Sequence, residues 1–315
     1  MTAGSVQVER RAGGQFVYRY RYDATGKRIS EYLGAHSEES TKARIERARE
    51  EIRDHETLAG YSQSLRKIGF YSADNSTVIS VAALFNAGIF GKGAVIVGTH
   101  AFGVLLNELG VSVSPFPMTE DVDVARAHRI EIAALPDGGL LALLKQTGLP
   151  FHEVPGLKRG EPATSFKVRG RKLKIDLLVS TNGVPYRAIR IPELNAYATG
   201  LPHLAYLLDD PVMSILIGRD RLVPVAIPHA GRFLIHKLAV ATLRSASDNP
   251  KREKDILQSA ILAVALAQEQ DFVLQDAIDA MNLALRNRVK PAIRRALKLL
   301  QLDYPAAAQL LEKLA

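Results

Sequence analysis

The residues best suited to chemistry are two aspartates, Asp121 and Asp123, in a short apolar segment. In an extended strand, side chains two positions apart point to the same face. Both carboxylates then stand side by side, while Val122 and Val124 turn to the core. Adjacent carboxylates repel each other, and a divalent cation is the usual way to offset that repulsion. The pair therefore predicts a metal site.

A third aspartate, Asp176, fits the same scheme. Residues 171–179 alternate between polar and apolar, which predicts a strand with Asp176 on its polar face. If this strand lies beside the first, three oxygen ligands on rigid strands could hold two Mg²⁺ ions roughly 3.5–4 Å apart. Such a pair of ions suits in-line displacement at a phosphate. The predicted metal ligands and catalytic residues are therefore Asp121, Asp123 and Asp176.

A phosphate-binding turn precedes these aspartates. The apolar run Ala94–Val97 predicts a buried strand, and apolar residues at helical spacing over 101–109 predict a helix directly after it. Gly98 has no Cβ, so a ligand can approach the backbone closely. Thr99 lies where the helix begins, and the free backbone N–H groups there suit a phosphate. The next residue, His100, either lines the site or packs the turn.

Together these motifs resemble a known family. Gly98 and Thr99 after a strand, Thr-x-Asp-x-Asp at residues 119–123 and a lone aspartate in a later strand are similar to the nucleotidyltransferase superfamily related to DNA polymerase beta. Val-Gly-Thr-His-Ala-Phe followed by Met-Thr-Glu-Asp-Val-Asp most resembles its poorly characterised bacterial branches, the nucleotidyltransferase-like domains. The resemblance covers residues 76–260. The alternative is that the carboxylates are solvated residues at a strand end.

The resemblance implies an activity and its requirements. A nucleoside monophosphate would pass from an NTP to a hydroxyl acceptor, with release of pyrophosphate. Two Mg²⁺ ions would be held by the three aspartates, and Asp176 would bind only the ion that activates the attacking hydroxyl. Gly98 and Thr99 would bind the phosphates of the nucleotide.

A second group of charged residues lies near the start of a predicted helical region. Lys237 stands among apolar residues of a helix, a poor environment for an unpaired ammonium group. Residues 248–255 form a basic helix start that holds Arg252 and Lys254. The resemblance implies that Lys237, Arg252 and Lys254 contact the triphosphate and that Asp255 orients one of the lysines. For Arg252 and Lys254, the alternative is a solvated helix start with ordinary capping.

The sequence leaves the acceptor open. RNA or tRNA 3′ ends, a protein hydroxyl and a small molecule of the antibiotic type all fit the same catalytic core. The formal charge of +8 and a basic N-terminal hairpin favour a nucleic acid or a protein. A non-catalytic alternative is a nucleic-acid-binding protein, in which the hairpin recognises DNA or RNA and the aspartates are inert.

Residues 15–33 predict that hairpin, because aromatic residues and arginines alternate before a turn at 23–26. The interleaved Tyr18, Arg19 and Tyr20 could present a basic, stacking face to RNA or DNA. The alternative, favoured from the sequence, is a small sheet with the tyrosines packed inward and the arginines in solvent. A helix of mixed charge is expected over 37–58 and an irregular stretch over 61–74.

Strands and helices alternate through the middle of the chain, and helices alone follow. In the middle we expect a helix over 76–90, a strand over 129–135, a helix over 140–146, a loop over 150–160, a strand over 164–168, and short strands and loops at the apolar runs 205–208, 213–217 and 222–227. Beyond them helices are expected near 230–246, 251–268, 271–286, 288–302 and 304–314.

The sequence therefore predicts an α+β protein. A polymerase-beta-like nucleotidyltransferase core, with a mixed sheet and flanking helices, would occupy residues 61–228. An N-terminal β-hairpin with its charged helix would occupy 1–60, and a C-terminal helical domain 229–315.

The composition narrows the class of protein. Without cysteine, the chain has no disulfide, no thiol catalysis and no cysteine-bound zinc. No apolar run reaches the roughly 18–20 residues of a membrane span, and the first residues lack an apolar signal core. These features predict a cytoplasmic bacterial protein without a membrane partner. The oligomeric state cannot be predicted from them.

Overall fold

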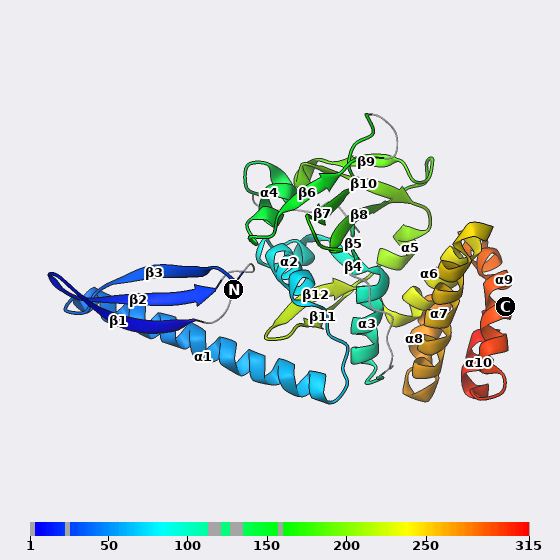
Figure 1. Cartoon of the computed structure of the whole chain (residues 1–315). Coiled ribbons are helices and arrows are strands. Elements are labelled where there is room, and N and C mark those ends of the chain that lie inside the picture. The colour runs from blue at the N-terminus through cyan, green and yellow to red at the C-terminus, as the bar shows by residue number, and fades with distance from the viewer. Residues whose placement is uncertain (1–3, 23–25, 113–120, 127–134, 157–159, 315) are drawn as a thin grey trace.

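The computed structural model describes residues 4–22, 26–112, 121–126, 135–156 and 160–314. In these ranges an N-terminal arm (residues 4–67) leads into a mixed sheet with its helices, and a group of helices forms the C-terminal end (Figure 1). The strand expected over 129–135 falls almost wholly outside the described residues. Within these ranges, every helix is too short or too polar to span a membrane.

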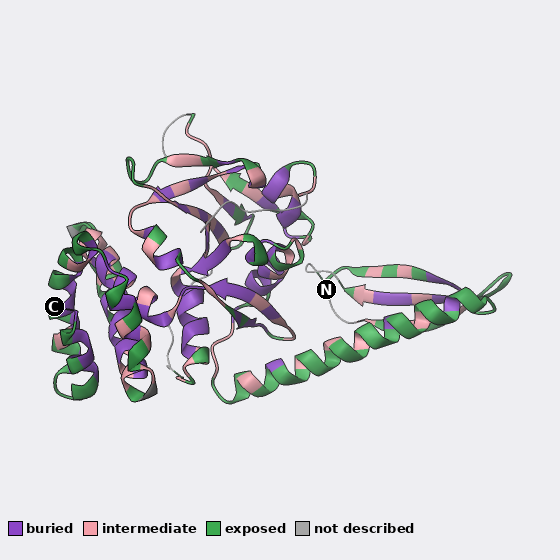
Figure 2. Ribbon diagram, turned by 180° about the vertical axis from the view of Figure 1, so that it is seen from behind, coloured by how far each residue is buried: buried purple, intermediate pink, exposed green. Residues whose placement is uncertain are grey.

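The N-terminal arm consists of three antiparallel strands and one long helix. These are β1 (Ser5–Arg11), β2 (Gly14–Tyr22), β3 (Arg28–Ala35) and α1 (Glu39–Lys67). The central strand, β2, pairs with both others. Val17, Leu33 and Ala48 form a small core that joins the sheet to α1. The arm extends away from the other elements, and most of α1 is exposed (Figures 1 and 2).

The arm corrects three expectations. The hairpin is present as β2 and β3, but β1 was missed. The irregular stretch expected from residue 61 is wrong as far as Lys67, because α1 continues and Ser62 Oγ donates a hydrogen bond to the Gly218 carbonyl at 2.6 Å. Arg19 is not in solvent: it is 8% exposed and forms an ion pair with Glu51 of α1.

A mixed sheet forms the centre of the molecule. Its main path runs in the order β4 (Ala94–Val97), β5 (Asp121–Arg126), β8 (Lys174–Ser180), β10 (Ala196–Leu201) and β9 (Ala188–Ile191). β8 runs parallel to β5 and β10, whereas β4 and β9 are antiparallel to their neighbours. β7 (Ser165–Val168) pairs with the first half of β8 and with β6 (Phe151–Val154). The loop expected over 150–160 is therefore wrong at β6.

Helices and one further hairpin surround the sheet. They are α2 (Asn75–Asn86), the 3₁₀ turn η1 (Phe90–Lys92), α3 (Gly98–Glu108), α4 (Gly139–Lys145), the 3₁₀ turn η2 (Pro192–Leu194), α5 (Leu204–Leu208), β11 (Val212–Ile217) and β12 (Leu222–Ile227). The apolar run at 205–208 is a helix rather than a strand, since a run of four apolar residues fits either state.

The C-terminal end is helical, as the sequence predicts. It comprises α6 (Ala230–Leu243), the 3₁₀ turn η3 (Ala246–Asp248), α7 (Asn249–Glu269), α8 (Asp271–Asp279), α9 (Leu283–Leu300) and α10 (Pro305–Glu312). The expected helix over 271–286 is too long, because α8 ends at Asp279 and a new helix, α9, follows. Asn282 caps the start of α9: its side chain accepts a hydrogen bond from the Leu285 N–H at 2.8 Å.

One hydrophobic core joins the sheet to the C-terminal helices. Phe102 of α3 stacks on Phe233 of α6, with ring centroids 6.1 Å apart. The start of α3 and the helices α6 and α7 are therefore held against one another by packed side chains. The fold is α+β with a mixed sheet, and the division into three domains stays a prediction.

Candidate active site

The sheet brings the three predicted aspartates to two neighbouring strands. β5 and β8 run parallel with Asp123 directly opposite Asp176 and Asp121 opposite Lys174. Residues paired in this way project from the same face of a sheet. The alternate residues Val122 and Ile175 are fully buried on the other face. One face of these strands thus carries carboxylates and the other packs in the core.

The carboxylate face is crowded with charge. Burial, and then the charges of Asp176 and Asp121, raise the pKa of Asp123 to about 7. Lys174 Nζ lies 2.8 Å from Asp176 Oδ2, and Ser165 Oγ donates to Asp176 Oδ1 at 2.5 Å. Asp176 is therefore already paired, whereas Asp123 carries a charge that its surroundings oppose.

Gly98 lies against Asp123. It begins α3 with a φ of +69°, and a Cβ built on it would overlap the Asp123 carboxylate. A residue with a side chain is disfavoured here by both the backbone conformation and the contact. The next residue, Thr99, is 8% exposed, and its Oγ1 accepts a hydrogen bond from Lys254 Nζ at 3.0 Å. The start of α3, Asp123 and Lys254 thus belong to one site.

Asp255 holds two cations behind this site. Its Oδ1 lies 3.0 Å from Lys237 Nζ and its Oδ2 lies 3.2 Å from Arg244 Nε. Asp255 is only 3% exposed, so the two cations compensate a buried charge. The structure places Asp255 beside a lysine, as the resemblance implies, and that lysine is Lys237.

Lys237 and Lys254 both act on the aspartates electrostatically. The charge of Lys237 opposes the rise in the pKa of Asp123. Burial, and then the charge of Lys237, lower the pKa of Lys254, while Asp255, Asp123 and Asp121 act in the opposite direction. Two of the three predicted phosphate-binding cations therefore lie near the carboxylates.

The third predicted cation, Arg252, lies elsewhere. Its NH2 group donates to the backbone carbonyls of Arg244 at 2.7 Å and Ser245 at 3.0 Å. Residues two apart on a helix point about 200° from each other, so Arg252 and Lys254 lie on opposite sides of α7. The structure does not bring Arg252 to the aspartates.

The metal site is not preformed in the described residues. Among them, no group of three or more histidine, cysteine, aspartate or glutamate side chains is gathered closely enough to hold a metal ion. Thr119 and Glu120, next to Asp121, lie outside the described ranges. The chemistry of the donors nevertheless fits Mg²⁺, because all are carboxylate oxygens. Burial, and then the charges of Asp176 and Asp121, raise the pKa of Asp123, and a bound cation would stabilise its charged form.

Several residues that support the site were missed from the sequence. Tyr71 Oη lies 2.6 Å from His100 Nδ1, and Asn107 exchanges two hydrogen bonds with the Tyr71 backbone. A Cβ on Gly103 would overlap the Tyr71 ring. His100 is 1% exposed, and burial lowers its pKa to about 4, so it packs the turn as a neutral side chain. Only Lys174 had a sequence signal, since it shares the polar face of its strand with Asp176.

Comparison with known protein families identifies the family of this chain. A model of the family described as Nucleotidyltransferase matches residues 75–282, about two thirds of the chain. No curated protein matches. A solved structure, an antigenic nucleotidyltransferase-like protein from Paracoccidioides brasiliensis, is 19% identical over 71% of this chain and 91% of that chain, with a TM-score of 0.33. A TM-score this low does not establish a common fold, so the family match carries the assignment.

Proposed function

Because the chain belongs to the Nucleotidyltransferase family, we propose that it transfers a nucleoside monophosphate from an NTP to a hydroxyl acceptor and releases pyrophosphate. The observation that carries this proposal is the pairing of Asp123 with Asp176 across two parallel strands, with Gly98 against Asp123. Carboxylates bind divalent metal ions and the N-terminus of a helix binds phosphate, and here the two lie side by side.

Asp121, Asp123 and Asp176 are the proposed ligands of two Mg²⁺ ions. Bound there, Mg²⁺ would supply positive charge that offsets the phosphates and lowers the pKa of the attacking hydroxyl. An ionised carboxylate has about four lone-pair sites, so Asp176 can bind a metal ion while Lys174 Nζ stays 2.8 Å from its Oδ2. Lys174 would then add positive charge beside the bound substrate.

The start of α3 is the proposed triphosphate site. The backbone N–H groups at Gly98 and Thr99 have no partner within the helix, and the positive end of the helix dipole lies there. Lys254, which donates to Thr99 Oγ1, adds a positive charge beside these groups. Lys237, held by Asp255, would neutralise the charge that develops on the departing pyrophosphate.

A nucleic acid is the favoured acceptor, and the N-terminal arm supplies the reason. On the face of its sheet away from α1, the Tyr18 and Tyr32 rings lie 5.3 Å apart and those of Tyr18 and Tyr20 lie 6.1 Å apart. Arg11 and Arg28 stand over two of these rings, at 4.9 Å and 4.3 Å from the ring centroids. Rings flanked by arginines suit stacking with bases and contact with phosphates. We name this outer surface the aromatic face (Phe16, Tyr18, Tyr22 and Tyr32); Tyr20, whose ring Arg28 covers, is buried at 7% exposed.

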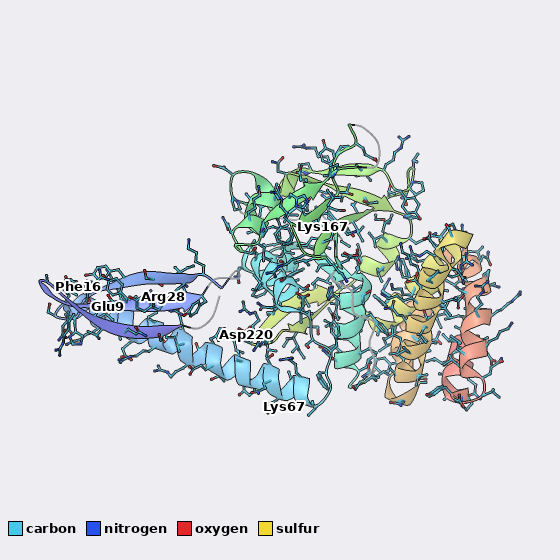
Figure 3. All side chains as sticks on the ribbon, in the orientation of Figure 1. Glu9, Phe16, Arg28, Lys67, Lys167 and Asp220 are labelled. Atoms are coloured by element: carbon cyan, nitrogen blue, oxygen red, sulfur yellow. The ribbon has the colours of Figure 1, made fainter. Side chains whose placement is uncertain are left out.

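The arm carries this face away from the aspartates. Figure 3 shows Phe16 and Glu9 near the far end of the arm, whereas Lys167 belongs to β7 of the central sheet. A ligand that engages both regions must be long, as a nucleic-acid strand is. The separation of the two regions favours RNA over a small molecule of the antibiotic type.

The proposal is tested by incubating the protein with Mg²⁺ and each of the four NTPs labelled in the α-phosphate, together with total cellular RNA and protein. Label in the RNA fraction, lost with EDTA and in the Asp121→Asn, Asp123→Asn variant, is the expected result. Label found in the protein fraction alone would show that the acceptor is a protein and not RNA. RNA binding without NTP binding would leave the non-catalytic alternative, in which the arm recognises nucleic acid and the aspartates are inert.

A further inference from the structure

A cavity of about 490 Å³ lies between the end of α6, the start of α7 and the middle of α9. Small side chains, including Ala241 and Ala292, form part of its wall and leave the space open. Its polar lining comes from Arg252, Arg288, Arg295, Asn287 and Thr242. None of the proposed catalytic aspartates lines it, so it is a separate feature of the molecule.

Positive charge dominates this cavity. Three arginines line it, and none of the described residues that line it is a carboxylate. Arg295 pairs with Glu253 at 3.3 Å, on a partly exposed surface where such a pair is weak. Within the described ranges, Arg288 forms no ion pair. Like charges gathered at one cavity repel each other, and an anionic ligand would offset that repulsion.

Arg252 is fixed in place while keeping nitrogen atoms for a ligand. Both of its hydrogen bonds in the described part of the chain, to the carbonyls of Arg244 and Ser245, come from the single nitrogen NH2. The guanidinium group has two further nitrogens, and its planar fork matches the oxygens of a phosphate. The residue is therefore ordered before a ligand arrives.

We propose that this cavity binds the phosphate group of a nucleotide, either free or within a nucleic-acid strand. Its volume lies in the usual range of small-ligand sites, about 300–1,000 Å³. Arginines supply the contacts for the phosphate, while the alanines and Ile256 offer an apolar surface to a sugar or base.

This site is distinct from the proposed triphosphate site. Arg252 and Lys254 lie on opposite sides of α7, and only Lys254 contacts the start of α3. Among the residues that the structure describes, the cavity lining offers no carboxylate to hold a metal ion. Its ligand should therefore bind without Mg²⁺, whereas the carboxylate site requires Mg²⁺ to receive a triphosphate.

The experiment measures binding to the full chain in EDTA by titration calorimetry, with adenosine 5′-monophosphate and with a short single-stranded RNA as probes. The test variant is Arg288→Gln combined with Arg295→Gln. The control is Arg294→Gln, an exposed arginine of the same helix that does not line the cavity. Loss of two charge-assisted contacts should weaken binding by about tenfold or more. The control should bind as the parent does.

Each outcome decides the proposal. If the parent binds the monophosphate and the test variant does not, the ligand is a free nucleotide. If the test variant loses binding of RNA alone, the ligand is a nucleic-acid strand. The proposal is overturned if neither probe binds in EDTA, or if the test variant binds both probes as tightly as Arg294→Gln does. RNA binding that the test variant keeps would then belong to the aromatic face of the arm. The Asp121→Asn, Asp123→Asn variant should bind both probes normally, so failure of the proposed catalysis would leave this result intact.

Discussion

Gly98 and the carboxylate of Asp123 are in such close contact that a β-carbon at position 98 would overlap Asp123 Oδ2. The φ of Gly98, +69°, lies in the left-handed region that favours glycine. The backbone at the start of α3 is thereby placed directly against the carboxylate that pairs with Asp176. In the proposed reaction, this contact brings the triphosphate site and the metal ligands together.

Replacing Gly98 should separate them. Gly98→Ala must push Asp123 aside and strain the backbone, so we expect transfer to fall by at least about tenfold and the free energy of unfolding to fall by roughly 1–3 kcal/mol. Gly91→Ala is the matched control, because a Cβ there meets nothing within 4 Å. Transfer rates and chemical denaturation measure both effects. Equal activity of the two variants would show that the close contact is not needed.

The raised pKa of Asp123 predicts a pH-dependent stability in the metal-free protein. Its folded-state pKa, about 7, exceeds the unfolded value of 3.8, so the folded state binds this proton more tightly. The contribution to stability is therefore complete below about pH 4 and is lost as the pH rises through 7. An asparagine at position 123 resembles the protonated aspartate and does not titrate, so its contribution to stability does not fall as the pH rises.

Asp123→Asn in EDTA should thus unfold like the parent at pH 4 but be more stable at pH 8, by roughly 1–3 kcal/mol after solvent screening. Urea denaturation at the two pH values measures the difference. A variant less stable than the parent at pH 8 would mean that Asp123 is not a destabilising charge.

The buried contact of Asp255 with Lys237 and Arg244 predicts a non-additive effect on stability. Asp255→Asn leaves two cations facing each other and should cost about 3–5 kcal/mol. Adding Lys237→Met to that variant removes one uncompensated charge and should restore part of the loss. Chemical denaturation of the parent, both single variants and the double variant completes this double-mutant cycle. Strictly additive losses would contradict the account of Asp255 as the partner of Lys237.

The aromatic face predicts where RNA binds. Tyr18→Ala combined with Tyr32→Ala removes two neighbouring rings and should weaken binding of a single-stranded RNA by about tenfold or more, since each stacked base contributes roughly 1–3 kcal/mol. Tyr61→Ala is the control, because Tyr61 is a 60%-exposed tyrosine on α1 outside this face. Fluorescence anisotropy of labelled RNA reports the affinities. A comparable loss of RNA affinity in both variants would show that the aromatic face is not the RNA-binding surface.

Alternation in single strands was enough to predict the aspartate-bearing strands. Leu173, Ile175, Leu177 and Val179 are all buried, as their spacing requires, and Ala94–Val97 is a buried strand with the bounds expected. These elements are strongly patterned over their own length. Their pairing could only be supposed from the sequence, because strand order depends on contacts between distant residues.

The sequence predictions are wrong where contacts between distant residues determine the local structure. α1 runs on past Gly60 to Lys67, where Ser62 is tied to Gly218. The four residues of β6 are a strand because they pair with β7, and nothing within them requires it. In the site, the pairing of Lys174 and Ser165 with Asp176 needs the sheet register. The position of Arg252 depends on which side of α7 faces the sheet. The family resemblance does not tell which side this is.

The proposed mechanism requires Asp123 and Asp176 to act together in nucleotidyl transfer. Its most direct test is the rate of label transfer from the preferred NTP in Asp123→Asn and Asp176→Asn, with Asp303→Asn, an exposed aspartate near the C-terminus, as control. Each site variant should remain folded and lose about a thousandfold in rate, or about 4 kcal/mol of barrier, while the control keeps the parent rate. Folded site variants that transfer label at the control rate would contradict the claim.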